Sequence, residues 1–408
     1  MKQWAQILLG VVTAVGGFIE VGDLVFLSQT GAQFRYQALW AIPLGIIGIG
    51  VYAEMCGRVA ATSGRAVFDV VRERLGFGTG LATLVAGQLV TLLTLAAEIG
   101  GVAIVLQLFF DLPNQLLIVV AALAFLAVIW AMPFAWIERL FGLLGLGLLA
   151  FIVSALDTSP DWGAIGKGLL PSWNGSDPVL YGYFAVGVVA AAFMPYEIYF
   201  YSSGGVEERW GRPDIRINRI TVIFGWGLGL LLAMAIMATA VQVLEPRSIE
   251  PTLLGTVGLG VQIPLGETGL QIGLLGMLFA IGGAAAETAL SCGYNIAQFF
   301  GWEWGKFRKP SGAPRFTIAA MVMLVFGALI IVTGLDAVQV TELAVIFGVV
   351  ALPFSYLPVL LVANDPTYME DQVNGRLANL LGWFYFVVIC AVALAAVPLM
   401  IATNMGQS

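Results

Sequence analysis

The sequence predicts an all-α integral membrane protein, and three observations lead to that fold class. Hydrophobic residues make up 60% of the chain, charged residues make up 11%, and the mean hydropathy is +0.94. This composition excludes a water-soluble domain. The apolar residues also fall in runs of about 20, the length of a bilayer-spanning helix, and not in the short alternating segments of an outer-membrane barrel.

The 408 residues leave room for eleven spans. The first run passes through glycines without a small-residue cleavage site, which indicates a retained span and not a signal peptide. Residues 66–75 carry apolar side chains at helical spacing with charges opposite, which predicts a short interfacial helix. The expected spans lie near 6–27, 37–57, 80–108, 115–132, 136–156, 180–202, 219–244, 269–299, 316–334, 338–361 and 378–402.

The basic residues predict the orientation of these spans. With the N-terminus in the cytoplasm, fifteen of the 18 Lys and Arg residues fall on the cytoplasmic side, as the positive-inside rule requires. The C-terminus of an eleven-span chain then lies outside, and a bacterial inner (plasma) membrane is the expected location. The three basic residues on the outer side are Arg35, Lys167 and Arg247.

No hydrophilic domain interrupts the spans, so residues 1–408 are expected to form a single transmembrane domain. The net charge of −7 is dispersed and gives no argument for a nucleic-acid partner. Histidine is absent, so no imidazole can shuttle protons or bind a metal. The three cysteines lie in or beside separate spans without metal-ligand spacing and are interpreted as packing residues. The oligomeric state stays open, a monomer included.

The first span is interrupted near its middle by glycines and carboxylates. Gly16, Gly17 and Gly22 each weaken a helix by about 1 kcal/mol relative to alanine. Glu20 and Asp23 lie among them, and acidic side chains at mid-bilayer depth are costly and usually mark an ion pathway. In an unwound segment these two carboxylates can converge on one cation together with free carbonyls.

The sixth span has a similar interruption. Pro195 has no amide proton and clashes with the preceding turn, which releases carbonyls near Ala191. Met194 offers a thioether, a ligand that favours transition metals over Mg²⁺ or Ca²⁺, although methionine also serves as core filler. Glu197 could act as a ligand, a gate or an ion-pair partner.

The two breaks belong to a wider repeat. Glu98 in the third span is matched by Glu287 in the eighth, five spans later, as the first break is matched by the break in the sixth span. An odd separation means that the second copy is inverted, which is the LeuT-type arrangement. We therefore expect one repeat at 6–156, a second at 180–361 and an additional helix at 378–402.

The remaining carboxylates in the spans differ in their surroundings. Glu98 has no basic residue near it in sequence, so its charged form would be costly and it could take up a proton. Glu54 lies four residues before Arg58, and a helical surface pair accounts for it.

Five motifs in register resemble the NRAMP family of divalent-metal transporters. They are Ile19-Glu20-Val21-Gly22-Asp23, the loop Thr30-Gly31-Ala32-Gln33-Phe34-Arg35-Tyr36, Ala97-Glu98-Ile99-Gly100-Gly101, Met194-Pro195-Tyr196 and Leu352-Pro353-Phe354. The resemblance covers nearly the whole chain. It implies the LeuT-type fold and proton-coupled uptake of Mn²⁺ or Fe²⁺. It also implies that the metal is held by the side chains of Glu20, Asp23 and Met194 and the carbonyl of Ala191.

The chain departs from the family pattern at several of these places. Glu20 replaces the family's aspartate and Asp23 its asparagine, so the site gains a carboxylate. Tyr196 replaces a histidine, and Leu95 stands where the family has an acid. Metal transport is expected to survive these changes better than proton coupling. Further candidates for an ion or proton site are Glu98, Tyr196, Glu197 and Glu287.

The sequence thus predicts a divalent-cation transporter of the Mn²⁺/Fe²⁺ type that works by alternating access, with little or no proton coupling. A Mg²⁺ carrier is the nearest alternative, because extra carboxylates suit a hard, partly hydrated ion. A Na⁺-coupled organic-solute carrier on the same fold is another. No nucleophile–base arrangement indicates an enzyme. No cofactor is expected; the metal ion is the substrate and the lipid bilayer the only other partner.

Overall fold

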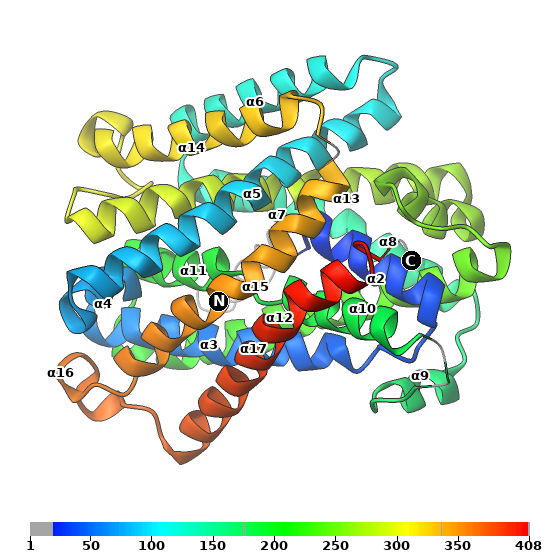
Figure 1. Ribbon diagram of the computed structural model, residues 1–408. Helices are drawn as coiled ribbons and strands as arrows, with labels where there is room; N and C mark the ends of the chain where they lie inside the picture. Colours follow the sequence, from blue (N-terminus) through cyan, green and yellow to red (C-terminus); the bar gives the residue numbers. More distant parts are fainter. Residues whose placement is uncertain (1–18, 174, 176, 336, 407–408) are drawn as a thin grey trace.

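The computed structural model describes residues 19–406 except 174, 176 and 336. Every regular element in these residues is helical, and ten helical segments among them are long and apolar enough to cross a membrane. The short helices α4 (Val67–Leu75) and α16 (Pro366–Met369) lie at one end of the bundle, and α9 (Trp162–Gly168) lies at the other (Figure 1). The all-α membrane fold predicted from composition is confirmed.

The ten segments are built by α3 (Ala41–Ser63), α5 (Phe77–Phe109), α6 (Asn114–Ala131), α7 (Phe134–Gly145) with η1 (Leu146–Leu148) and α8 (Leu149–Asp157), α10 (Pro178–Ala191) with α11 (Pro195–Glu207), α12 (Ile215–Thr239) with the π-helix η3 (Ala240–Leu244), α13 (Leu254–Phe300), α14 (Pro314–Val332), α15 (Ala337–Val362) and α17 (Arg376–Ala402). Before them comes α2 (Val21–Phe34), whose 14 described residues are too few to be counted among the ten.

Most predicted spans are confirmed as helices with small shifts of their ends, and the short helix predicted at 66–75 is α4. The first predicted span, 6–27, begins outside the described residues. Its second half is α2, which continues to Phe34, so the prediction that the span ends at 27 is wrong.

The eighth span differs more from its prediction of 269–299. The polar stretch before it is helical from Leu254 onward, and the chain turns at Gly266, which has φ 69° and ψ −165°. Leu270 lies where a Cβ on Gly258 would point, and Val261 lies against Gly273 in the same way. The first part of α13 therefore folds back along the second as a helical hairpin.

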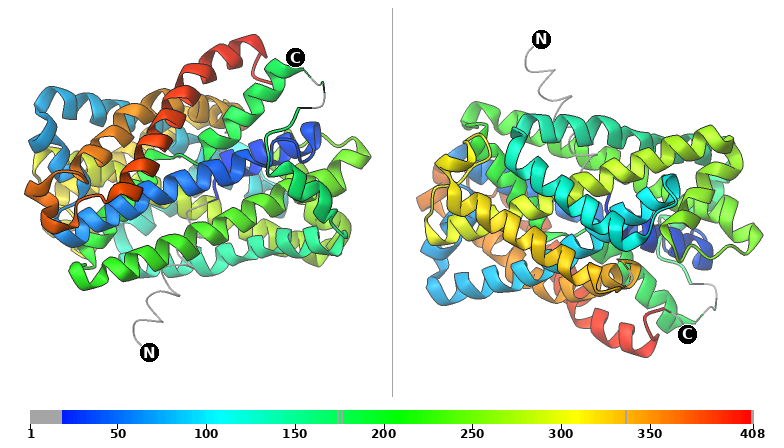
Figure 2. Two further views of the ribbon diagram at one scale, coloured as in Figure 1. Left: turned by 90° about the horizontal axis from the view of Figure 1, so that it is seen from below. Right: turned by 90° about the horizontal axis from the view of Figure 1, so that it is seen from above.

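The centre of the bundle is α5, which packs against α13, α15, α14 and α6. The last helix, α17, packs on α15 and α10. It lies at the periphery in both views of Figure 2, and only 17% of the residues in its most apolar 18-residue stretch are buried. At one crossing no side chain intervenes: a Cβ on Gly147 of η1 would lie 2.6 Å from the Ile272 carbonyl oxygen, and one on Gly276 of α13 would lie 2.3 Å from the Leu148 nitrogen.

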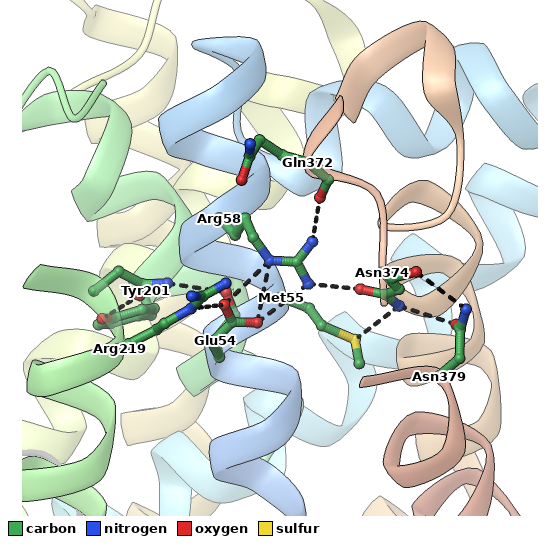
Figure 3. Close-up of polar contacts among 9 residues, drawn as sticks. Glu54, Met55, Arg58, Tyr201, Arg219, Gln372, Asn374 and Asn379 are labelled. Atoms are coloured by element: carbon green, nitrogen blue, oxygen red, sulfur yellow. Dashed lines mark hydrogen bonds and ion pairs between the residues drawn. The ribbon is translucent and has the colours of Figure 1, made fainter. Parts of the chain in front are cut away.

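A polar cluster ties several helices together near α16 (Figure 3). Arg58 of α3 bonds to the Glu54 carboxylate at 3.1 Å, to the Gln372 carbonyl at 2.5 Å and to the Asn374 side chain at 2.6 Å. Arg219 of α12 pairs with Glu54 at 3.1 Å. The predicted Glu54–Arg58 pair is confirmed, but the prediction that it lies on the surface is wrong. The Arg58 side chain is only 4% exposed, because residues from distant parts of the chain cover it.

We call Glu54, Arg58, Arg219, Gln372 and Asn374 the Arg58 cluster, and the end of the bundle that carries it and α4 the basic end. Further pairs at this end join Arg74 to Asp365, and Arg212 to Glu370 and Asp371.

Candidate metal site

The first break is built by the start of α2. Ile19 and Glu20 are not helical, and Glu20 caps the helix with an extended backbone, φ −103° and ψ 177°. Its amide donates to Oδ2 of Asp23 at 3.2 Å. Both carboxylates therefore lie at a helix N-terminus, where the peptide dipoles favour negative charge. Glu20 is 2% exposed and Asp23 9%.

The second break separates α10 from α11. The helix α10 ends at Ala191, and α11 begins at Pro195. Between them Met194 has an extended backbone, φ −85° and ψ 119°. Because proline has no amide proton, the Ala191 carbonyl lacks the donor that a continuous helix would provide four residues later. Ala191 and Met194 are both buried, so the break leaves one carbonyl and one thioether in the interior.

Helices α5 and α11 bring further polar groups to the first break. The Glu20 carboxyl lies beside the Glu98 carboxyl of α5 and the Tyr196 hydroxyl of α11. The charges of Asp23 and Glu287 act on Glu98, and they also act on Glu197. Glu98, Tyr196 and Glu197 are buried, whereas Glu287 of α13 is partly exposed. We call Glu20, Asp23, Glu98, Glu197 and Glu287 the acidic centre.

Several atoms of this region lack a partner. In the described part of the chain, four buried side-chain oxygens of this region have no hydrogen bond of normal geometry. They are Oε1 of Glu20, both carboxyl oxygens of Glu98 and the hydroxyl of Tyr196. No ion pair joins a carboxylate of the acidic centre to Lys or Arg within those residues. A buried, unpartnered carboxylate is expensive. A cation from outside the protein would satisfy these atoms.

The donor types fit a divalent ion. Carboxylate and carbonyl oxygens suit Mn²⁺, Mg²⁺ and Ca²⁺, and the thioether of Met194 adds affinity for softer transition metals. Among the described residues no three acidic or cysteine side chains already surround a single point. A site here therefore needs the Ala191 carbonyl, Met194 or water in addition to the carboxylates of Glu20 and Asp23.

Sequence reasoning did not single out as candidates a set of buried neutral polar residues on α5 and α13. Thr94 on α5 and Thr288, Asn295 and Gln298 on α13 are all at most 4% exposed, and each has a side-chain oxygen without a hydrogen-bond partner. On α13 these positions are seven and three residues apart, a spacing that keeps them on one helical face. That spacing was the signal in the sequence. Single polar residues separated by apolar ones in a membrane span do not by themselves indicate a site.

Fold and site together define a class: a multi-pass helical membrane protein whose two broken helices bring carboxylates to its interior, as in LeuT-type transporters. The family model described as "Natural resistance-associated macrophage protein-like" matches residues 10–398. The chain belongs to this family.

Relatives and solved structures agree with that assignment. The chain is 25% identical over 389 residues to the divalent metal cation transporter MntH of Deinococcus radiodurans, covering 92% of this chain and 85% of the relative. It is 26% identical over 405 residues to the MntH of Mycobacterium tuberculosis, covering 95% and 90%. A crystal structure of a mutant manganese transporter of Eremococcus coleocola superposes with a TM-score of 0.76 at 20% identity, covering 99% of this chain and 89% of that one. The predicted LeuT-type fold and family membership are confirmed.

Proposed function

We propose that this protein carries a divalent metal cation of the Mn²⁺ type across a membrane by alternating access. The observation that carries the proposal is the set of unpartnered carboxylate atoms where two broken helices meet. Membership of the family, and relatives named divalent metal cation transporters, support the same function. The ligands we propose are the side chains of Glu20, Asp23 and Met194 and the carbonyl of Ala191, with Glu98, Tyr196, Glu197 and Glu287 as further contributors.

Mg²⁺ is the second candidate substrate, and a specific observation favours it. The Glu98 carboxyl lies beside that of Glu20, and the charges of Asp23 and Glu287 act on Glu98. Several carboxylates with water suit a hard cation. Met194, buried at the second break, favours Mn²⁺ over Mg²⁺. Measuring the uptake of Mn²⁺ and Mg²⁺ side by side would show whether the carboxylates or the Met194 thioether determines the preferred ion.

We further propose that the protein lies in a bacterial inner membrane with its basic end in the cytoplasm, its N-terminus inside and its C-terminus outside. The positions of Arg58, Arg74, Arg212 and Arg219 at one end of the bundle support this orientation. The division into repeats at 6–156 and 180–361, followed by 378–402, stays part of the proposal, as does a transporter without a resident cofactor or enzymatic activity.

Proteoliposomes test the function directly. Uptake of Mn²⁺, Mg²⁺ and Ca²⁺ would be measured while the internal pH is followed. We expect Mn²⁺ uptake with little acidification, because the chain has no histidine and has Leu95 in place of the family's acid. Vesicles with Glu20→Ala/Asp23→Ala protein serve as the control. Equal uptake by both preparations would refute the proposed site, and acidification matched to metal entry would show coupling.

A further inference from the structure

Four aromatic rings form a continuous row where α5 begins and α13 ends. Between ring centroids, Phe77 lies 5.5 Å from Phe299, and Phe299 lies 5.1 Å from Phe300. Phe300 in turn stacks on Trp302 at 5.2 Å. We call Phe77, Phe299, Phe300 and Trp302 the aromatic row. Figure 1 shows the start of α5 and the connection from α13 to α14 at the end of the bundle that carries α4, so the row belongs to the basic end. Phe77 and Phe300 are exposed.

Two arginines lie over this row. The guanidinium carbon of Arg72 is 5.9 Å from the ring centroid of Phe299, and that of Arg315 is 5.5 Å from the ring centroid of Trp302. Arg72 also donates to the Phe299 carbonyl at 2.6 Å. Both arginines are exposed, and within the described residues neither forms an ion pair with a carboxylate. The rings therefore hold two guanidinium groups in place without a counter-charge.

Other arginines at the basic end do have a carboxylate partner. Arg74 pairs with Asp365. Arg308, on the same connection as Trp302, pairs with Glu303. An anion from outside the protein has little to gain at these positions, because the guanidinium is already neutralised. At the two arginines over the aromatic row such an anion would supply the missing counter-charge.

The surface next to the row is apolar. On α14, Ile318, Val322 and Val325 are 57%, 43% and 42% exposed. They follow Arg315 by three, seven and ten residues, a spacing that places all three on the same side of the helix as the arginine. An exposed apolar stripe on a membrane-spanning helix faces acyl chains. Arg315 therefore lies where an acyl-facing stripe meets the basic end, which is the position of a lipid headgroup.

We propose that Arg72, Arg315 and the aromatic row form a binding site for acidic phospholipids, such as phosphatidylglycerol, in the leaflet at the basic end. The lipid phosphate accepts hydrogen bonds from a guanidinium group, and an acyl chain lies along the exposed stripe of α14. A zwitterionic phospholipid offers the same chains but carries its own cation, so it binds less well. The inference does not depend on which metal the protein carries.

The fluorescence of Trp302 tests the site directly. The unmodified protein and Trp302→Phe would be placed in nanodiscs of phosphatidylcholine and phosphatidylglycerol, with bromine on the acyl chains of one of the two lipids. Bromine quenches a tryptophan that it approaches, and the difference in emission between the two proteins is the contribution of Trp302. We expect brominated phosphatidylglycerol to quench this contribution about threefold more strongly than the same share of brominated phosphatidylcholine. Equal quenching by the two lipids would overturn the proposal.

Substitution of the arginines tests their role. Arg72→Gln/Arg315→Gln should abolish the preference for phosphatidylglycerol. Arg315→Gln alone should reduce it, and this variant is expected to fold, since within the described residues the Arg315 side chain contacts a ring and makes no hydrogen bond. The matched control is Arg216→Gln/Arg376→Gln, which removes two exposed arginines of the basic end that lie over no described ring. The control should keep the preference, and an undiminished preference in the double variant of the row would contradict the proposal.

Inorganic phosphate distinguishes a lipid site from a site for soluble anions. An excess of sodium phosphate should leave the quenching by brominated phosphatidylglycerol at the level found in sodium chloride of equal ionic strength, because the acyl chain adds to the binding of the headgroup. Recovery of the Trp302 emission in phosphate and not in chloride would show that a free anion occupies the site, and the lipid proposal would be wrong.

Discussion

The acidic centre and the Arg58 cluster each contain buried charges, those of Glu20 and Glu98 in the first and that of Arg58 in the second, yet they are built in opposite ways. In the Arg58 cluster each charge has a counter-charge or a hydrogen bond, and the partners come from α3, α12 and the segment before α17. In the acidic centre like charges gather, and no Lys or Arg of the described residues pairs with any of its carboxylates. Matched burial of charge is typical of a structural role. Unmatched burial is typical of a binding site that awaits its ligand.

The largest expected effect is the loss of metal binding when two carboxylates of the acidic centre are removed. Glu20→Ala/Asp23→Ala should lower Mn²⁺ affinity at least a hundredfold by calorimetry, because both proposed carboxylate ligands are removed. The same change should raise the melting temperature of the metal-free protein in detergent by a few degrees, since buried repulsion is relieved. Glu267→Ala, an exposed carboxylate, is the control. Retained affinity would refute the ligand assignment.

The Arg58 cluster should respond in the opposite sense. Arg58→Met leaves the Gln372 carbonyl and Asn374 without their donor, and we expect a loss of about 3 kcal/mol of stability. Metal affinity of the folded fraction should not change. Arg212→Met removes a more exposed pair with Glu370 and should cost about 1 kcal/mol or less. The comparison between the two regions would fail if Arg58→Met abolished metal binding in folded protein.

Met194 sharpens the comparison within the acidic centre. A thioether contributes little to a hard ion and more to a soft one. Met194→Ala should therefore lower Cd²⁺ affinity about tenfold and leave Mg²⁺ affinity nearly unchanged, as measured by competition calorimetry. Similar losses for both ions would show that Met194 acts through packing.

A smaller effect is expected at α4, outside the spans. Burial raises the pKa of the Asp69 carboxyl to about 6, despite the attraction of Arg65. An acid whose pKa rises on folding destabilises the fold increasingly as the pH rises from about 4 to above 6. At pH 7.5, Asp69→Asn should thus raise the free energy of unfolding by about 1 kcal/mol, which is measured as a higher melting temperature. At pH 4.5 the substitution should have little effect.

Asp365 provides a control of opposite sign. The backbone amide of Thr367 and the Arg74 guanidinium lower the pKa of the Asp365 carboxyl. Its contribution to stability is therefore present above the ordinary pKa of aspartate and is lost as the pH falls. Asp365→Asn should lower the melting temperature at pH 7.5. If both variants shifted it in the same direction, the electrostatic interpretation would be wrong.

The sequence allowed the spans, both helix breaks and the members of the acidic centre to be predicted, because glycine, proline and carboxylates have strong local effects in an apolar helix. The burial of Arg58 could not be predicted. Its spacing to Glu54 indicates a pair, but Gln372 and Asn374 lie more than 300 residues away. The hairpin at Gly266 was also missed, because a polar stretch between spans resembles a loop until its packing against Leu270 is known.

The crossing of Gly147 and Gly276 has a consequence for the geometry of the whole interior. Because no side chain lies between the two backbones, the two glycines allow η1 and α13 to approach until their backbones are in contact. Glu287 lies eleven residues beyond Gly276 on α13, about 16 Å along the helix. Alanine at either glycine would push the helices apart, and the rigid rod of α13 would carry that displacement to Glu287. The contact between Gly147 and Gly276 therefore helps to set the position of Glu287, although it lies outside the acidic centre.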